Sequence, residues 1–185
     1  MTAIATRGAA GPEAAAAWRQ PLGVRRRTVE WDDPMHLVMA ALERTGLETM
    51  QEVSDGTLPP PTIALLLGFG PSELEHGRTV FTAEPGEHLY NPMATVHGGV
   101  ITTWLDTAMG CAVYTTLPVG TAYTTLDLQV RFVRPITLAT GPVSIVGEVV
   151  HRGGRIATAE GRVIDGEGRL LAHATTSCMI WEVPA

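Results

Sequence analysis

The chain of 185 residues is long enough for one domain with an appendage and can bury a sizeable core. Hydrophobic residues make up 45% of it and charged residues 17%, which is typical of a globular protein rather than a disordered one. The net charge of −6 argues against nucleic acid as the main partner, because a phosphate backbone requires a basic face. The longest apolar stretch, residues 63–67, is far shorter than the roughly 20 residues of a membrane span, so no membrane partner is expected.

The two cysteines, Cys111 and Cys178, have neither metal-site spacing nor the density of a disulfide framework. The N-terminus lacks the apolar segment of a secretory signal. A reduced, cytoplasmic location is therefore expected, with no bound metal.

The N-terminal part divides into two regions. Residues 1–32 are rich in Ala, Gly and Pro without a lasting amphipathic period, and we expect a flexible tail. Residues 33–70 are predicted to form a helical extension, in which Asp33 caps a helix that has Pro34 at its first position and that Gly46 ends or bends. The apolar segment 62–67 fits a helical turn or a strand, and its periodicity does not decide.

The third region, residues 71–185, has a regular rhythm of strands around one helix. Turn residues at Pro135, Gly141-Pro142, Gly153-Gly154 and Asp165-Gly166 separate consecutive apolar runs, which predicts antiparallel pairing and an α+β arrangement. The expected elements are a strand at 78–83, a loop at 87–96, a helix at 97–116, and strands at 122–133, 143–151, 155–164 and 170–180.

The predicted central helix has a broad apolar face that should pack on the sheet. Asp106 falls well off the centre of that face. On the same side lie small residues, namely Gly99, Thr103 and Gly110. Small residues allow another helix, a partner chain or a ligand to approach the backbone closely.

The start of this helix is equally unusual. A loop with Asn91 and His97 runs into Gly98-Gly99, a pair that suits a helix N-terminus whose free N–H groups face a ligand. Such an end presents unpaired donors and a positive dipole, which favours an oxyanion. We therefore expect Gly99 to contact a bound substrate.

These residues carry a resemblance to a known family. The segments NPMATVHGGV (91–100) and LDTA (105–108) resemble the signature of hotdog-fold acyl-CoA thioesterases, most closely the phenylacetate-pathway (PaaI-like) type. The run YTTLDLQVRFVRP (123–135) is similar to the family's third-strand region, and the likeness spans about residues 73–181. It implies a hotdog fold, in which an antiparallel sheet wraps around one long helix, and an acyl-CoA substrate with no separate cofactor.

The resemblance also implies roles for individual residues. Asp106 matches the general base or nucleophile that acts on the thioester, and the N–H of Gly98 matches the group that polarises its carbonyl. Asn91 and His97 match residues that help to place the thioester and the water. A hydroxyl residue near the third strand often assists, and Thr125 holds that position here.

Thr124 is a near rival for the hydroxyl role. The run 122–133 alternates polar and apolar residues, so one face of that strand carries Gln129 and Arg131. Because the phosphates of CoA need local positive charge, the candidates for binding them are Arg131, Arg134, Arg152 and Arg155, and we favour Arg131 and Arg155. Gln129, on the same polar face as Arg131, is a further candidate for substrate binding.

Helix geometry adds an expectation about assembly. Gly98 and Asp106 are eight residues apart, about 12 Å along a helix axis, which an Asp side chain cannot span. If both act on one thioester, they must come from two chains. We therefore expect a symmetric homodimer with two shared sites, assembled further into a dimer of dimers, which is a homotetramer.

Two other functions fit parts of the pattern. A hotdog hydratase or dehydratase would use His97 and Asp106 to move protons on enoyl or hydroxyacyl thioesters. A non-catalytic acyl-CoA-binding module would need an output domain, and residues 1–70 show no helix-turn-helix. The absence of Gly-x-Ser-x-Gly and of paired histidines argues against a serine hydrolase and a metal hydrolase.

Overall fold

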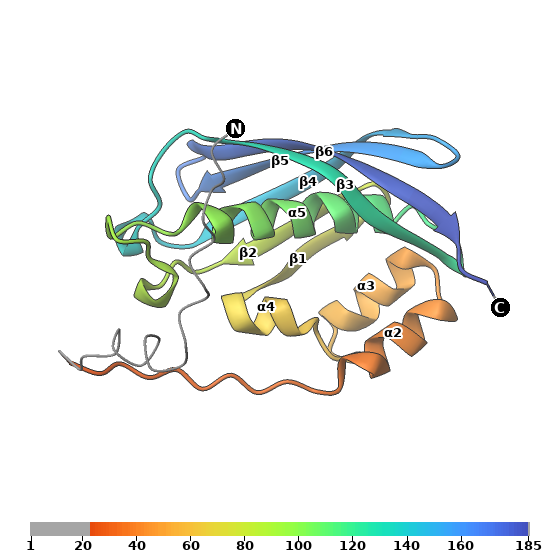
Figure 1. Cartoon of the computed structure of the whole chain (residues 1–185), viewed down its shortest axis with the longest axis horizontal. Coiled ribbons are helices and arrows are strands. Elements are labelled where there is room, and N and C mark those ends of the chain that lie inside the picture. Colours follow the sequence, from red (N-terminus) through yellow and green to blue (C-terminus); the bar gives the residue numbers. More distant parts are fainter. Residues whose placement is uncertain (1–22, 185) are drawn as a thin grey trace, which may run out of the picture.

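A computed structural model describes residues 23–184, so most of the predicted tail lies outside the described residues. Six antiparallel strands form one sheet in the order β1-β2-β4-β5-β6-β3, which curves around the long helix α5 (Figure 1). This is the predicted α+β hotdog fold. The strands and the helix are β1 (Phe69–Glu75), β2 (Arg78–Ala83), α5 (Gly98–Tyr114), β3 (Thr121–Phe132), β4 (Val143–Arg152), β5 (Ile156–Asp165) and β6 (Leu170–Glu182).

The apolar face of α5 forms the centre of the core. Trp104, Leu105, Ala108 and Met109 are fully buried against the sheet. Each large apolar side chain buried in this way contributes roughly 1.5–3 kcal/mol. Contact is closest at Gly147 of β4, where a Cβ atom would lie 2.3 Å from the carbonyl oxygen of Ala108, so only glycine allows the helix to sit this low on the sheet.

Three short helices precede the sheet: α2 (Pro34–Leu42), α3 (Gly46–Ser54) and α4 (Thr62–Leu67). Asp33 caps α2 with Pro34 in its first turn, as predicted. Gly46 does not bend one continuous helix but begins the second one, because Thr45 and Glu48 form a capping box at that point. The undecided segment 62–67 is helical, and Gly68 ends it with a positive φ of 70°.

Strand β1 is the element that the sequence analysis missed. It begins at Phe69, two residues before the expected start of the sheet domain, and pairs with β2. Pro71 interrupts its register, and this proline together with the flanking glycines hides the alternation that would indicate a strand.

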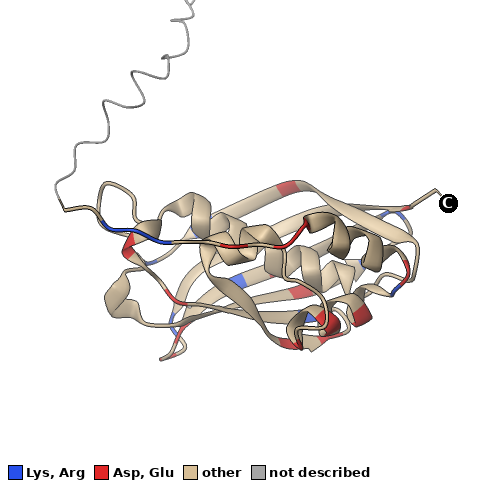
Figure 2. Cartoon of the chain, turned by 90° about the horizontal axis from the view of Figure 1, so that it is seen from below, with Lys and Arg blue, Asp and Glu red and all other residues tan. Residues whose placement is uncertain are grey.

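The segment before α2 runs extended along the outside of the domain and carries a run of basic residues (Figure 2). Arg27 donates to the carbonyl oxygens of Leu65 and Leu66 at 3.0 and 2.8 Å, and thereby satisfies the C-terminal end of α4. Arg25 pairs with Glu87. Within residues 23–184, no helix is long and apolar enough to cross a membrane.

Candidate active site

Asp106 and Thr125 meet in the structure. Asp106 lies in the middle of α5, half-buried, and its Oδ1 accepts a hydrogen bond of 2.8 Å from the Thr125 hydroxyl. Thr124, the rival for this position, is exposed. Of the two adjacent threonines, Thr125 is therefore the one that contacts the carboxylate.

A bulge in β3 explains this choice. The register of β3 against β6 shifts between Thr125 and Asp127, so Leu126 is an extra residue. On either side of it, Thr125 and Leu128 are half-buried on the helix side of the strand, whereas Leu126 and Asp127 are exposed. Without the bulge, strict alternation would not place both residues on the side that faces α5.

The N-terminus of α5 presents a free amide. His97 is the N-cap, and its Nδ1 accepts from the Gly99 N–H at 2.9 Å. The N–H groups of Val100 and Ile101 bond to the His97 carbonyl oxygen. Within the described part of the chain, the Gly98 N–H has no partner, so this one donor stays available to an incoming oxyanion.

Asn91 shapes the loop in front of this amide. Its Oδ1 accepts from the N–H groups of Met93 and Thr95 at 2.9 and 3.3 Å, and its Nδ2 donates to the Thr95 hydroxyl at 2.9 Å. The loop turns at Ala94, which has a positive φ of 57°. The predicted residue Asn91 thus holds the loop that leads to His97.

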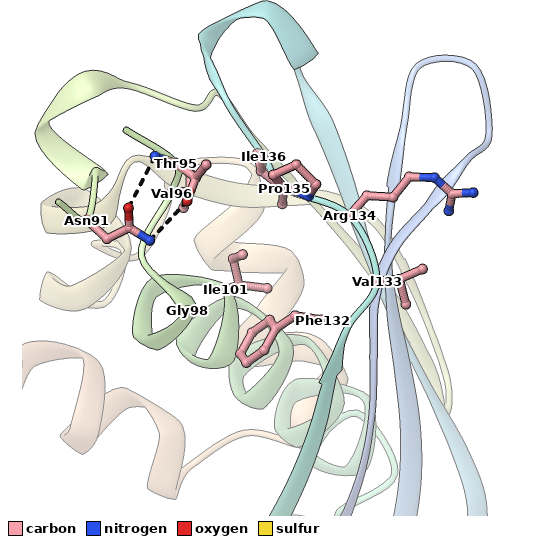
Figure 3. Close-up of a pocket in the computed structure, with 10 residues that line it drawn as sticks. All are labelled: Asn91, Thr95, Val96, Gly98, Ile101, Phe132, Val133, Arg134, Pro135 and Ile136. Atoms are coloured by element: carbon pink, nitrogen blue, oxygen red, sulfur yellow. Dashed lines mark hydrogen bonds between the residues drawn. The ribbon is translucent and has the colours of Figure 1, made fainter. Parts of the chain in front are cut away.

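A pocket of about 360 Å³ opens beside Gly98 (Figure 3). Asn91 and Gly98 line it on one side, and the chain that follows β3 closes the other side. Phe132 points toward the start of α5, whereas Arg134 extends away from it and donates to the Leu170 carbonyl oxygen at 2.5 Å. Asp106 is not among the lining residues, so one chain does not bring the free amide and the carboxylate into one pocket.

The small-residue face of α5 has a different use from the one predicted at Gly110. A Cβ atom there would lie 2.8 Å from the hydroxyl of Tyr123, so at this position the chain's own β3 covers the helix.

The thiol of Cys111 lies on the same helix. Burial and the nearby carboxylate of Asp106 raise its pKa to about 12. The thiol therefore stays protonated and is a poor nucleophile.

The structure does not bring together the three other residues predicted to bind substrate. Gln129 and Arg131 are exposed on β3 and line neither the Gly98 pocket nor the pocket that contains Arg155. Arg155 lies with Arg152 in a second pocket of about 470 Å³ at the opposite end of β3, beside Thr121. Arg134, which the sequence also indicated as a candidate for binding the phosphates of CoA, lines the Gly98 pocket, whereas Arg131 does not.

Comparison with known proteins gives the family. Residues 93–172, which include the start of α5, Asp106 and Thr125, match the model of the thioesterase superfamily. A candidate esterase of Halobacterium salinarum is 30% identical over 131 residues, which cover 70% of this chain and 76% of that protein.

The chain belongs to the thioesterase superfamily. Among solved structures, a candidate thioesterase of Ralstonia eutropha, a phenylacetic acid degradation-related protein, is 26% identical, with a TM-score of 0.65 over 70% of this chain and 98% of that one. A Streptococcus mutans protein bound to acetyl-CoA shares the fold at 24% identity, with a TM-score of 0.57 over 63% of this chain and 91% of that one. This member of the superfamily is a thioester hydrolase of the PaaI-like type, as the sequence motifs implied.

Proposed function

We propose that this thioesterase hydrolyses acyl-CoA in sites shared by the two subunits of a symmetric dimer. Each site would join the Asp106 carboxylate of one subunit to the free Gly98 amide of the other. The observation that carries the proposal is that α5 bears two groups able to act on a thioester, the free Gly98 N–H and the Asp106 carboxylate, which accepts one hydrogen bond. These groups lie about 12 Å apart on one rigid helix and in different surroundings.

The free edge of the sheet supports a dimer. Strand β3 has 12 residues and pairs only with β6 among the described strands, so its outer edge has unpaired backbone groups. Leu126 and Phe132 on this strand are 53% and 55% exposed. A long, partly apolar edge of this kind pairs readily with another strand, and a second copy of β3 related by a two-fold axis would cover it.

The contacts of β3 suggest the register of that pairing. Thr125 contacts Asp106, and the Phe132 ring lies 3.1 Å from the position of a Cβ atom on Gly98. If Thr125 faces Phe132 of the partner subunit, Asp106 therefore comes next to the partner subunit's Gly98. Because the strands run in opposite directions, Thr121 then comes near Ile136 of the partner subunit.

That register also brings positive charge to the site. Thr121 borders the pocket of Arg152 and Arg155, and Ile136 borders the Gly98 pocket, so the two pockets would adjoin across the interface. Arg155 has no acidic partner among the described residues, although Glu182 lines the same pocket. We therefore place the phosphates of CoA at Arg152 and Arg155, in keeping with the acetyl-CoA bound by the Streptococcus mutans protein.

The chemistry follows from the two groups. The Gly98 N–H stabilises the negative charge on the thioester oxygen. Asp106 either takes a proton from the water that attacks the carbonyl carbon or attacks that carbon itself, with water then hydrolysing the resulting anhydride. In both routes the carbon–sulfur bond breaks, the CoA thiolate leaves and is protonated, and the free acid remains.

Mixed dimers test the shared site. Gly98→Pro removes the amide hydrogen at a helix position that tolerates proline, and Gly98→Ala adds a comparable Cβ atom but keeps the hydrogen. We expect Gly98→Pro to lower kcat by about 10²–10³, the usual cost of one oxyanion donor. Gly98→Ala should lose much less.

Subunits with Asp106→Asn and subunits with Gly98→Pro, each nearly inactive alone, are then refolded together and assayed for CoA thiol release. Half of the dimers are mixed and each has one intact site, so the mixture should regain about a quarter of wild-type activity. A mixture as inactive as its components would contradict a shared site. Failure of the wild type to release thiol from any acyl-CoA would contradict the substrate class.

A further inference from the structure

The structure contains a further pocket, apolar in its lining, that the proposed chemistry does not use. It has a volume of about 100 Å³ and lies between the N-terminal helices and the sheet domain. Met50 of α3 and Ala64 of α4 line it from one side, and Phe69, Phe81 and residues of α5 line it from the other. Nearly all of this lining is apolar, so the pocket would hold a hydrocarbon group rather than an ion or a water cluster.

The position of this pocket ties it to Asp106. Thr107 and Cys111, the α5 residues that line it, follow Asp106 by one and five positions. On a helix the Thr107 side chain diverges from that of Asp106 by about 100°, so the pocket lies beside the carboxylate rather than beneath it. A molecule held at Asp106 can reach the pocket by passing over Thr107.

We propose that this pocket receives the apolar end of the acyl chain and that the N-terminal extension thereby sets acyl-chain specificity. The inference depends on the proposed acyl-CoA hydrolysis at Asp106. The N-terminal helices supply Met50 and Ala64, so a segment outside the sheet domain determines which chains fit.

Helix geometry indicates the chain length. Cys111 lies about 7.5 Å further along the α5 axis than Asp106, a distance that about six extended methylene groups cover. The pocket is smaller than an engineered apolar cavity of about 150 Å³ that binds benzene, so it has room for the end of one chain only. The preferred substrates are therefore medium-chain acyl-CoAs of about six to ten carbons, because acetyl falls short of the pocket and palmitoyl exceeds it.

Cys111 is suited to this role. Its thiol pKa is raised to about 12, chiefly by burial, so the side chain is uncharged at neutral pH. An uncharged thiol packs as a small hydrophobic group, which is the surface that a methyl terminus needs.

The test compares acetyl-, octanoyl- and palmitoyl-CoA in the intact protein. Ala64→Leu fills the pocket from α4 and should lower the octanoyl-to-acetyl ratio of kcat/KM by at least about 10-fold, a typical effect of a few methylene groups in a hydrophobic site. Met50→Ala enlarges the pocket and should raise the palmitoyl-to-octanoyl ratio. Leu66→Phe is the matched control, because Leu66 is on the same helix but 50% exposed and outside the pocket lining. It should leave both ratios unchanged.

The outcomes separate this inference from the function on which it depends. If the wild type hydrolyses acyl-CoAs and neither Ala64→Leu nor Met50→Ala changes the chain-length ratios, the pocket assignment is wrong and the proposed function stands. If the wild type releases no thiol from any of the three esters, both are wrong. The two variants change the pocket in opposite directions, so a folding defect in one leaves the other as a test.

Discussion

Two carboxylates in this protein, Asp106 and Asp165, have opposite surroundings. The Asp165 side chain is 2% exposed and accepts from the N–H groups of Glu167 and Arg169 and from the Arg169 guanidinium, at 3.0, 2.9 and 2.7 Å. Asp106 accepts one hydrogen bond, from Thr125, and has no basic partner among the described residues. Asp165 closes the turn between β5 and β6, whereas Asp106 keeps unused acceptor sites in the middle of a helix.

This difference separates a structural carboxylate from a chemical one. A buried carboxylate whose hydrogen bonds are all made stabilises the fold, and its charge is already paired with donors of the protein. A carboxylate with one neutral donor can still accept a proton or attack a carbonyl carbon. The comparison therefore predicts that substitution of Asp106 affects turnover and that substitution of Asp165 affects stability.

The largest expected effect is that of Asp106→Asn on activity. The amide oxygen can still accept from Thr125, so the fold should be retained, but the group can neither take a proton nor attack. We expect kcat to fall by about 10²–10⁴, the usual contribution of a positioned base. Steady-state kinetics and thermal melting check the prediction together. A variant with near-normal kcat, or one that melts far below the wild type, would remove Asp106 from the chemical role.

Thr125 gives a smaller effect that tests the same carboxylate through its one donor. Thr125→Val keeps the shape of the side chain and removes the hydroxyl, and we expect kcat to fall about 10-fold, in line with the loss of one hydrogen bond to a charged group. Steady-state kinetics measure this loss, and thermal melting checks that the fold is retained.

Thr125→Ser keeps the hydroxyl and is the matched control. It should retain the rate of the wild type. Equal losses in Thr125→Val and Thr125→Ser would mean that the packing of this side chain matters rather than its hydrogen bond.

The sequence alone predicted the parts of this comparison that depend on local patterns. The central helix, five of the six strands and the facing of Asp106 away from the core followed from periodicity, and the segment 91–108 indicated the family. What it did not predict depends on contacts between distant segments. The bulge at Leu126 selects Thr125 over Thr124, and Tyr123 covers Gly110. No spacing within one strand shows either of these, because both depend on how β3 meets β6 and α5.

Asp165 was likewise seen only as part of a turn. Asp-Gly indicates a hairpin, but the sequence does not show that the carboxylate turns inward and meets Arg169 four residues later. Burial by itself would raise the pKa of this carboxyl group, but the hydrogen bonds from Arg169 and Glu167 and the charge of Arg169 outweigh burial, so the net pKa is lowered. The folded state therefore favours the charged form.

The smallest expected effect is that of Asp165→Asn, on stability alone. Because the native pKa lies below that of the unfolded chain, Asp165 stabilises the fold above about pH 4, and this contribution is lost as the pH falls through the native pKa. The variant should melt a few degrees below the wild type at pH 7, a modest shift for a domain of this size, and the gap should narrow as the pH falls below about 4. Its kcat should be unchanged, because the hydrogen bonds that Asp165 accepts come from Glu167 and Arg169, which are not residues of the proposed site. If the difference in melting temperature instead stayed constant down to pH 3, the shape of the turn rather than the charge of Asp165 would stabilise the hairpin. The contrast between Asp165 and Asp106 would then be one of packing rather than of electrostatics.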